Sequence, residues 1–167
     1  MIMKKFIRML IITFILLISC KDEPKSIKIS KNNFKITINF PDTVYINEDY
    51  DGKIDYKNDL DSITTRFDDV KKARFLDYYF LKTKNINYTD DYLKNIVTDT
   101  FTAENNRMIP LYNIKFDKLG LNYIDGMITD EVMIENGSRN AEGKPMTRIL
   151  TNEFRATKGV YVIERHR

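Results

Sequence analysis

The feature that most constrains the fold is an alternation of apolar and polar side chains that begins at Phe34. Apolar side chains occupy every second position from Phe34 to Phe40, and lysine, threonine and asparagine fill the positions between them. Successive side chains of a β-strand point to opposite faces of the sheet, so a period of two predicts a half-buried strand. Pro41 ends this strand, and the same period returns at Val44 and Ile46.

Turn and cap residues divide the middle of the chain into further elements. Asp51-Gly52 predicts a hairpin turn with a second strand on its far side. The segment 68–82 fits either an amphipathic helix or a strand, and we favour a strand because it is dense in aromatic residues and its neighbours are strands. Thr89, which two aspartates follow, predicts the capped start of a short helix.

The C-terminal third is expected to be β-structure as well. The sequence predicts, in order, strands at 109–116 and 121–135, a polar loop at 136–145, and a terminal hairpin made of strands 147–156 and 160–165. Gly126 indicates a bend or bulge within the longest strand, and Lys158-Gly159 indicates the turn of the hairpin. Eight or so short strands separated by turns predict an all-β fold, either a sandwich or a barrel.

One stretch carries a resemblance to a known fold family. Phe116-x-x-x-Gly120-x-x-Tyr123-Ile124-x-Gly126 resembles the turn between two late strands of immunoglobulin-like domains, where a glycine makes the corner and a tyrosine packs across it. The resemblance implies an immunoglobulin-like antiparallel β-sandwich over residues 34–167, although the spacing is not the Asp-x-Gly-x-Tyr of the usual tyrosine corner. Such sandwiches serve many unrelated functions, so the fold by itself implies no activity.

The N-terminal stretch has the composition of a secretory signal peptide. Three basic residues precede an apolar run at 11–18, which is shorter than the roughly 20 residues of a membrane-spanning helix. The motif Leu17-Ile18-Ser19-Cys20 resembles the lipobox of bacterial lipoproteins. This resemblance implies cleavage between Ser19 and Cys20, and attachment at Cys20 of acyl chains such as palmitate, which hold the protein on a membrane. An ordinary cleaved signal with an incidental Cys20 is the alternative.

The residues after Cys20 bear on where the protein resides. Lys21-Asp22-Glu23 resembles the export signal of Bacteroidetes surface lipoproteins. The resemblance implies a lipid-anchored protein of the outer membrane, displayed on the cell surface; a solvated tether in the periplasm is the alternative. The expected organisation is a signal peptide at 1–19, a lipidated N-terminus and tether at 20–33, and the β-sandwich at 34–167.

The charge and cysteine content exclude some partners and one means of stabilisation. All 24 acidic residues follow Cys20, and three of the 27 basic residues precede it, so the mature chain has 24 charges of each sign and no formal net charge. A neutral chain has no general attraction to polyanions, and no nucleic-acid partner is expected. Because Cys20 is the single cysteine, no internal disulfide can form and the fold depends on its core.

One cluster of acids resembles a metal-binding loop. Asn47, Asp49, Asp51 and Asp55 fall on the ligand positions of an EF-hand calcium loop, with a glycine at the sixth position. The twelfth position is Asn58 instead of a bidentate glutamate, and the flanking segments alternate like strands. The alternative interpretation is a hairpin loop whose acids are solvated.

Residues with a catalytic pattern are scarce. No cysteine is left as a nucleophile, His166 is the single histidine and is penultimate in the sequence, and no serine has the context of a nucleophile elbow. We therefore expect a protein that is not an enzyme and has no cofactor. The remaining candidates are tyrosines that supply contact area with a polar tip, at Tyr78, Tyr79, Tyr88, Tyr92 and Tyr112. Core positions of a sandwich are their alternative role.

These observations favour a surface-displayed binding or structural module, anchored to the membrane, with an unknown protein or glycan partner. Two alternatives are an accessory glycan-binding lipoprotein of an outer-membrane uptake system and a small hydrolase that works with carboxylates. Exposed aromatic rings beside polar side chains would favour the glycan. A deep cleft holding two close acids would favour the hydrolase.

Overall fold

Residues 34–165 are the part of the chain that the computed structural model describes. The predicted signal peptide, its cleavage site at Ser19 and Cys20, the tether and His166 all lie outside this range. Within the described residues, no helix is long and apolar enough to span a membrane.

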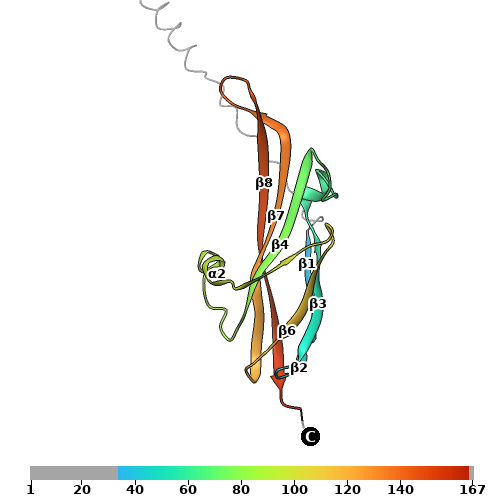
Figure 1. The fold of residues 1–167 in the computed structure, drawn as a ribbon. Coiled ribbons are helices and arrows are strands. Elements are labelled where there is room, and N and C mark those ends of the chain that lie inside the picture. Colours follow the sequence, from blue (N-terminus) through green and yellow to red (C-terminus); the bar gives the residue numbers. More distant parts are fainter. Residues whose placement is uncertain (1–33, 166–167) are drawn as a thin grey trace, which may run out of the picture.

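Within residues 34–165 the chain forms two β-sheets, one α-helix and one short 3-10 helix (Figure 1). The smaller sheet is antiparallel and has three strands in the order β1 (Lys35–Asn39), β3 (Asp49–Lys57) and β6 (Met108–Lys115). The larger sheet has five strands in the order β2 (Thr43–Tyr45), β8 (Pro145–Ile163), β7 (Gly120–Arg139), β4 (Lys72–Thr83) and β5 (Asp99–Thr102). It is antiparallel except that β2 runs parallel to β8, and it curls into a half-barrel.

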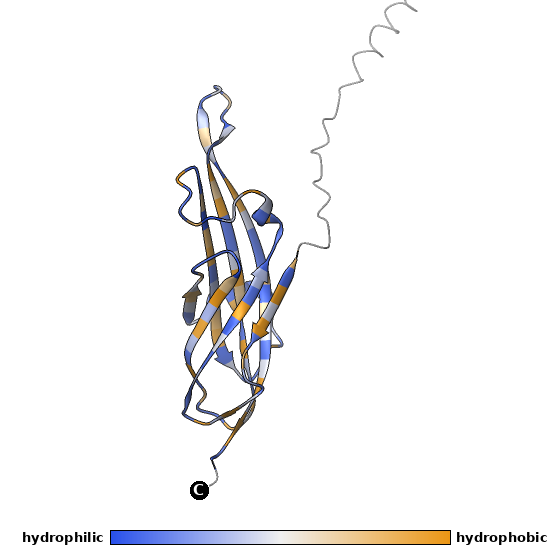
Figure 2. Cartoon of the chain, turned by 90° about the vertical axis from the view of Figure 1, so that its right-hand side faces the viewer, coloured by the Kyte–Doolittle hydropathy of each residue, from blue (hydrophilic) through white to orange (hydrophobic). Residues whose placement is uncertain are grey.

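The hydrophobic core lies between the two sheets. Apolar and polar residues alternate along the strands (Figure 2). Because successive side chains point to opposite faces, each sheet turns one apolar face inward. The larger sheet contributes Leu76, Tyr78 and Phe80 from alternate positions of β4, and the smaller sheet contributes Ile54 and Tyr56 from β3. The prediction of an all-β chain is confirmed at this level.

β7 and β8 form the longest hairpin of the molecule and extend past the other strands (Figure 1). Their pairing is regular from Gly120 to Ile134, and it shifts register between Ile134 and Ser138. Asn136 has a φ of 54° within this shift. Because β4 begins opposite Ile134, the hairpin continues beyond that point as a two-stranded ribbon.

Several predicted elements are confirmed. The ambiguous segment 68–82 contains strand β4 and no helix. The predicted short helix is α2 (Asp90–Ile96), and the Thr89 side chain caps it by accepting a hydrogen bond from the backbone N–H of Tyr92. Gly120 starts β7 with a φ of 80°, a conformation that a β-branched residue strongly disfavours.

The predicted turn at Asp51-Gly52 is wrong. β3 is one strand from Asp49 to Lys57, with a register shift against β6 between Tyr50 and Gly52, and the chain turns before it at Asn47, whose φ is 60°. Gly52 lies against β1 instead: an added Cβ would be 2.6 Å from the carbonyl oxygen of Asn39 and 2.7 Å from the ring of Phe40. The glycine therefore permits a close approach within the sheet, and it does not form a turn.

The predicted terminal hairpin around Lys158-Gly159 is also wrong. β8 is one continuous strand, and Gly159 pairs with Tyr123 of β7 in an unbroken register. Gly126 forms no bulge, because it pairs regularly with Phe80 on one side and Ala156 on the other. The long uninterrupted partner strands override the local turn signals at both glycines.

Candidate binding surface

The five candidate tyrosines do not form one cluster. Tyr78 is buried in the core, and its hydroxyl donates a hydrogen bond to the carbonyl oxygen of Ala156 (2.8 Å). Its neighbour Tyr79 points to the opposite face of the larger sheet and is 37% exposed. Tyr88 and Tyr92 lie before and within α2 with their ring centroids 5.9 Å apart. Tyr112 is on β6 in the other sheet.

The four candidate metal ligands are spread along the turn before β3 and along β3 itself. Asp49 forms an ion pair with Lys115 (3.3 Å), and Asp51 accepts a hydrogen bond from the backbone N–H of Asn113 (2.9 Å). Asp55 pairs with Lys53 (3.3 Å). These acids sit on alternate positions of a strand, and Asn47 belongs to the turn. No group of three or more acidic, histidine or cysteine side chains within residues 34–165 is placed to hold a metal ion.

A buried arginine cluster joins the two sheets on the inner face. Arg74 of β4 donates to both carboxylate oxygens of Asp130 on β7, at 2.9 and 2.6 Å, and to Asp61 (2.8 Å). The Tyr56 hydroxyl, from the smaller sheet, also donates to Asp130 (3.0 Å). Burial opposes the charge of Arg74, but its hydrogen bonds to Asp130 and Asp61 outweigh burial and raise its pKa.

A second cluster lies on the outer face of the same sheet. Arg155 of β8 donates to both oxygens of Asp125, at 3.1 and 2.7 Å, and Thr157 and Tyr88 donate to the same carboxylate. Burial alone would raise the pKa of Asp125, but these hydrogen bonds outweigh burial and lower it. Burial and Asp125 together raise the pKa of Tyr88 to about 12.

Sequence patterns do not predict these two clusters, because the residues that form each cluster lie far apart in the chain. Arg74 and Asp130 are 56 positions apart, and Arg155 and Asp125 are 30 apart. Each buried carboxylate accepts hydrogen bonds from an arginine and from at least one tyrosine, and neither aspartate is exposed.

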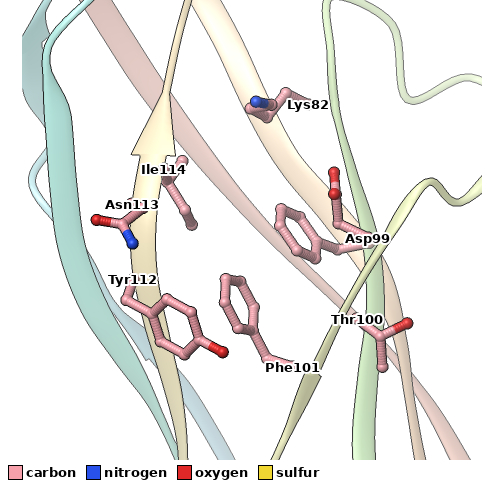
Figure 3. A pocket seen from close by; sticks show the side chains of 8 residues that line it. Lys82, Asp99, Thr100, Phe101, Tyr112, Asn113 and Ile114 are labelled. Atoms are coloured by element: carbon pink, nitrogen blue, oxygen red, sulfur yellow. The ribbon is translucent and has the colours of Figure 1, made fainter.

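A cleft of about 260 Å³ opens between the edge strands β5 and β6 (Figure 3). Two of its rings belong to the core, Phe80 and Phe101, which stack with centroids 5.0 Å apart; the third, Tyr112, packs edge-on against Phe101 at 4.7 Å and is 56% exposed. Lys82 and Asp99 line the cleft together with these rings. The cleft therefore lies where the edges of the two sheets separate, and its buried apolar residues Phe80, Phe101 and Ile114 belong to the core.

Two further hollows, of about 230 and 280 Å³, share Tyr79 and Thr129 and form one shallow groove on the outer face of the larger sheet. We refer to it as the outer-face groove; its lining residues are Phe75, Asp77, Tyr79, Lys94, Val97, Met127, Thr129, Glu131 and Met133. Strands β4 and β7 form its floor, and residues at and just after α2 bound one end.

The strand register arranges the floor of the outer-face groove in rows. Phe75 lies opposite Glu131, Asp77 opposite Thr129, and Tyr79 opposite Met127. Phe75 is 50% exposed, so half of a large apolar side chain faces solvent. Burial and the nearby Asp77 raise the pKa of Tyr79. The groove therefore offers two rings with polar side chains between them.

The sequence of β4 contains a signal for this surface. Residues 75–80, Phe-Leu-Asp-Tyr-Tyr-Phe, place aromatic rings on both faces of the strand. Leu76, Tyr78 and Phe80 enter the core, which leaves Phe75 and Tyr79 on the outside. When a strand carries aromatic rings on both faces, the rings on the outer face are not needed for the core and are available for binding.

Comparison with known proteins gives no relative: no protein-family model, no curated protein and no solved structure matches this chain.

Proposed function

We propose that this chain is a non-enzymatic binding module of a bacterial cell envelope. In this proposal the signal peptide 1–19 is removed, Cys20 carries the lipid, and residues 20–33 tether an immunoglobulin-like β-sandwich to the outer membrane at the cell surface. The two sheets packed around one core support a sandwich. The parallel pairing of β2 with β8 and the curl of the larger sheet depart from a purely antiparallel one.

The observation that carries the proposal is the outer-face groove. A large ring such as Phe75 is normally buried, and leaving it half exposed in a hollow forgoes about 1 kcal/mol or more of hydrophobic stabilisation. Grouped apolar side chains with a polar surround are the usual mark of an interaction site. Tyr79 and Met133 extend the same surface along the two strands, whereas Met127 is buried.

The state of the buried acids supports binding over catalysis. Asp130 and Asp125 are each paired with an arginine and covered. General acid–base chemistry with two carboxylates needs at least one that is accessible to a substrate and able to hold a proton near neutral pH.

A photo-reactive amino acid at position 75, in cells, tests the groove. We expect cross-linked adducts that decrease when Tyr79 is also replaced by Ala. The matched control places the same amino acid at Thr37, an exposed position on β1 of the smaller sheet. Equal adducts at positions 75 and 37, or none at either, would argue against a binding role for this surface.

The anchor is tested separately. Cys20→Ala should yield a chain that is unlipidated and mislocalised or uncleaved, and protease added to intact cells should digest the wild-type domain. A Cys20→Ala chain that is processed normally and still partitions into membranes would contradict the lipoprotein assignment. Complete protection from protease in intact cells would place the domain in the periplasm.

A glycan is the alternative ligand class for the same surface. The specific observation in its favour is that Phe75 and Tyr79 flank the hydrogen-bonding side chains of Asp77 and Thr129. Purified cell-surface polysaccharides should then compete with cross-linking at position 75, whereas a protein partner would resist that competition.

A further inference from the structure

The floor of the outer-face groove carries two acidic side chains, Asp77 and Glu131, that form no salt bridge within residues 34–165. Asp77 accepts a hydrogen bond from the Thr102 hydroxyl (2.6 Å), and Glu131 accepts one from Thr151 (3.3 Å). Both donors are neutral, and within residues 34–165 neither carboxylate belongs to a salt bridge. The lysine at the end of the groove, Lys94, is already paired with Glu153 (2.7 Å). The groove therefore presents uncompensated acidic charge beside exposed aromatic rings.

Each of these carboxylates has an aromatic ring as its neighbour. Glu131 lies opposite Phe75 on the adjacent strand, where Cβ atoms are about 5 Å apart. Asp77 lies two positions from Tyr79 on the same face of β4, so the two side chains are neighbours. A ring beside a carboxylate suits a lysine or arginine side chain, because the alkyl stem packs on the ring while the charged end meets the acid.

The spacing of the two pairs matches an extended peptide. Phe75 and Tyr79 are four residues apart on one strand, which corresponds to about 13 Å along β4. In a second extended chain, side chains at positions i and i+4 also share a face and have the same spacing. Two basic side chains four residues apart can therefore engage both pairs at once.

We propose that the outer-face groove binds an extended basic segment of a partner protein that lies along β4. One lysine or arginine of that segment contacts Phe75 and Glu131, and a second, four residues away, contacts Tyr79 and Asp77. This inference rests on the proposed function, whose partner it assigns to a chemical class.

The acidic charge of the groove argues against two other occupants, a second copy of this chain and a neutral glycan. A second copy of this chain, related by a two-fold axis, would bring the same acidic floor against itself and place four unpaired carboxylates in one interface. A neutral glycan can hydrogen-bond to Asp77 and Glu131, but it leaves their charges uncompensated as they lose water. A cationic segment satisfies both the rings and the acids.

The test uses the full-length chain in detergent and labelled nine-residue peptides of alternating threonine and valine with lysine at positions 3 and 7. Fluorescence anisotropy should detect binding that weakens as salt is raised from low to physiological concentration. A peptide with glutamate at positions 3 and 7 should not bind measurably. A peptide with lysines at positions 3 and 6 should bind less tightly, because its second lysine points away from the groove.

Variants of the chain locate the contact. Glu131→Gln and Asp77→Asn should each weaken binding about two- to fivefold, the range of an exposed ion pair. Phe75→Ala should weaken it at least as much. Glu104→Gln, at an exposed acid in the turn that leads into β6, is the matched control and should leave binding unchanged.

Three results would overturn the inference. These are equal binding of the lysine and glutamate peptides, no effect of Glu131→Gln, and displacement of the lysine peptide by a neutral polysaccharide. If the lysine peptide fails to bind while cross-linking at position 75 still captures a partner in cells, the basic class is wrong and the proposed function stands. If neither experiment yields a complex, both are wrong.

Discussion

The molecule contains two arginine–aspartate clusters, one on each face of the same strand, and they differ in what surrounds them. Asp125 and Asp130 lie an odd number of positions apart on β7, so the pleat sends them to opposite faces. Asp130 meets Arg74 between the sheets, where neither side chain is exposed. Asp125 meets Arg155 on the outside, where the arginine is 23% exposed.

The partners of the two arginines show the difference in role. Arg74 links Asp130 to Asp61 and to the carbonyl of Thr64, and thus ties the larger sheet to the short helix η2 (Asp59–Ser62) and its exit. Arg155 donates to the carbonyls of Ile86 and Tyr88, and thus fastens the segment before α2 to the sheet. One arginine–aspartate pair is therefore part of the core, and the other holds a surface segment against the sheet.

The largest effect is expected from Arg74→Met. It leaves Asp130 buried without its cation, and loss of one partner of a buried pair costs about 3–5 kcal/mol of unfolding free energy. Chemical denaturation measures this change. The double variant Arg74→Met/Asp130→Leu should recover a substantial part, because it buries no uncompensated charge. A double variant as unstable as the sum of both single variants would contradict the assignment of the cost to the unpaired acid.

Arg155→Met should cost less, about 1–3 kcal/mol, because Thr157 and Tyr88 continue to donate to Asp125. Its effect should also be local: amide hydrogen exchange should accelerate in the segment that leads into α2 and remain slow in β3. Arg107→Met is the control, since Arg107 is half exposed in its pair with Asp61 and should contribute at most about 1 kcal/mol. If amide exchange accelerated equally throughout the molecule, Arg155 would not have the local role that distinguishes it from Arg74.

Acid should weaken the outer cluster in a defined direction. The folded pKa of Asp125 is lowered below its unfolded value of about 3.9. Its carboxylate therefore contributes stability that is complete above that unfolded value and is lost as the pH falls through the lower folded pKa. Denaturation of wild type and Asp125→Asn at pH 6 and at pH 2 measures the difference. The gap between the two proteins should narrow at pH 2, and a constant gap would contradict the lowered pKa.

The smallest effects are expected from the two tyrosines that donate to the aspartates. Tyr88→Phe should cost about 0.5–1.5 kcal/mol, the net value of one hydrogen bond. Tyr56→Phe should cost more, because its hydroxyl also accepts a hydrogen bond from Asn58 (2.6 Å) and this amide would be left buried. Equal costs for the two variants would indicate that the inner and outer environments are energetically alike. Thermal unfolding of the two variants makes this comparison.

The sequence predicted the strands well where alternation is long, and Gly120 does start a strand with positive φ, but the turns predicted from Gly52 and Gly159 were wrong. Gly52 and Gly159 each follow a polar residue in the manner of a turn, but one lies beneath Phe40 and the other is a regular member of a long ladder. Whether a glycine marks a turn or a close approach depends on a partner strand that local sequence does not specify.

The candidate surface was predicted only in part for a similar reason. Tyr79 was a candidate from the aromatic density of β4, but its neighbour Tyr78 had equal standing and lies in the core. The alternation predicts that the two rings point to opposite faces of β4. Which face is covered depends on where the second sheet packs, and local sequence does not specify that. Phe75 and Glu131 were not candidates, because their pairing depends on the register between β4 and β7.

The parallel pairing of β2 with the end of β8 determines when this protein can finish folding. Thr43 and Tyr161 are neighbours in the sheet although almost the whole described chain separates them. A chain still being synthesised contains β2 long before the strand that β2 must join, and contacts between such distant segments form slowly. β2 therefore lacks its partner strand until β8 is available, and the larger sheet is completed late in folding.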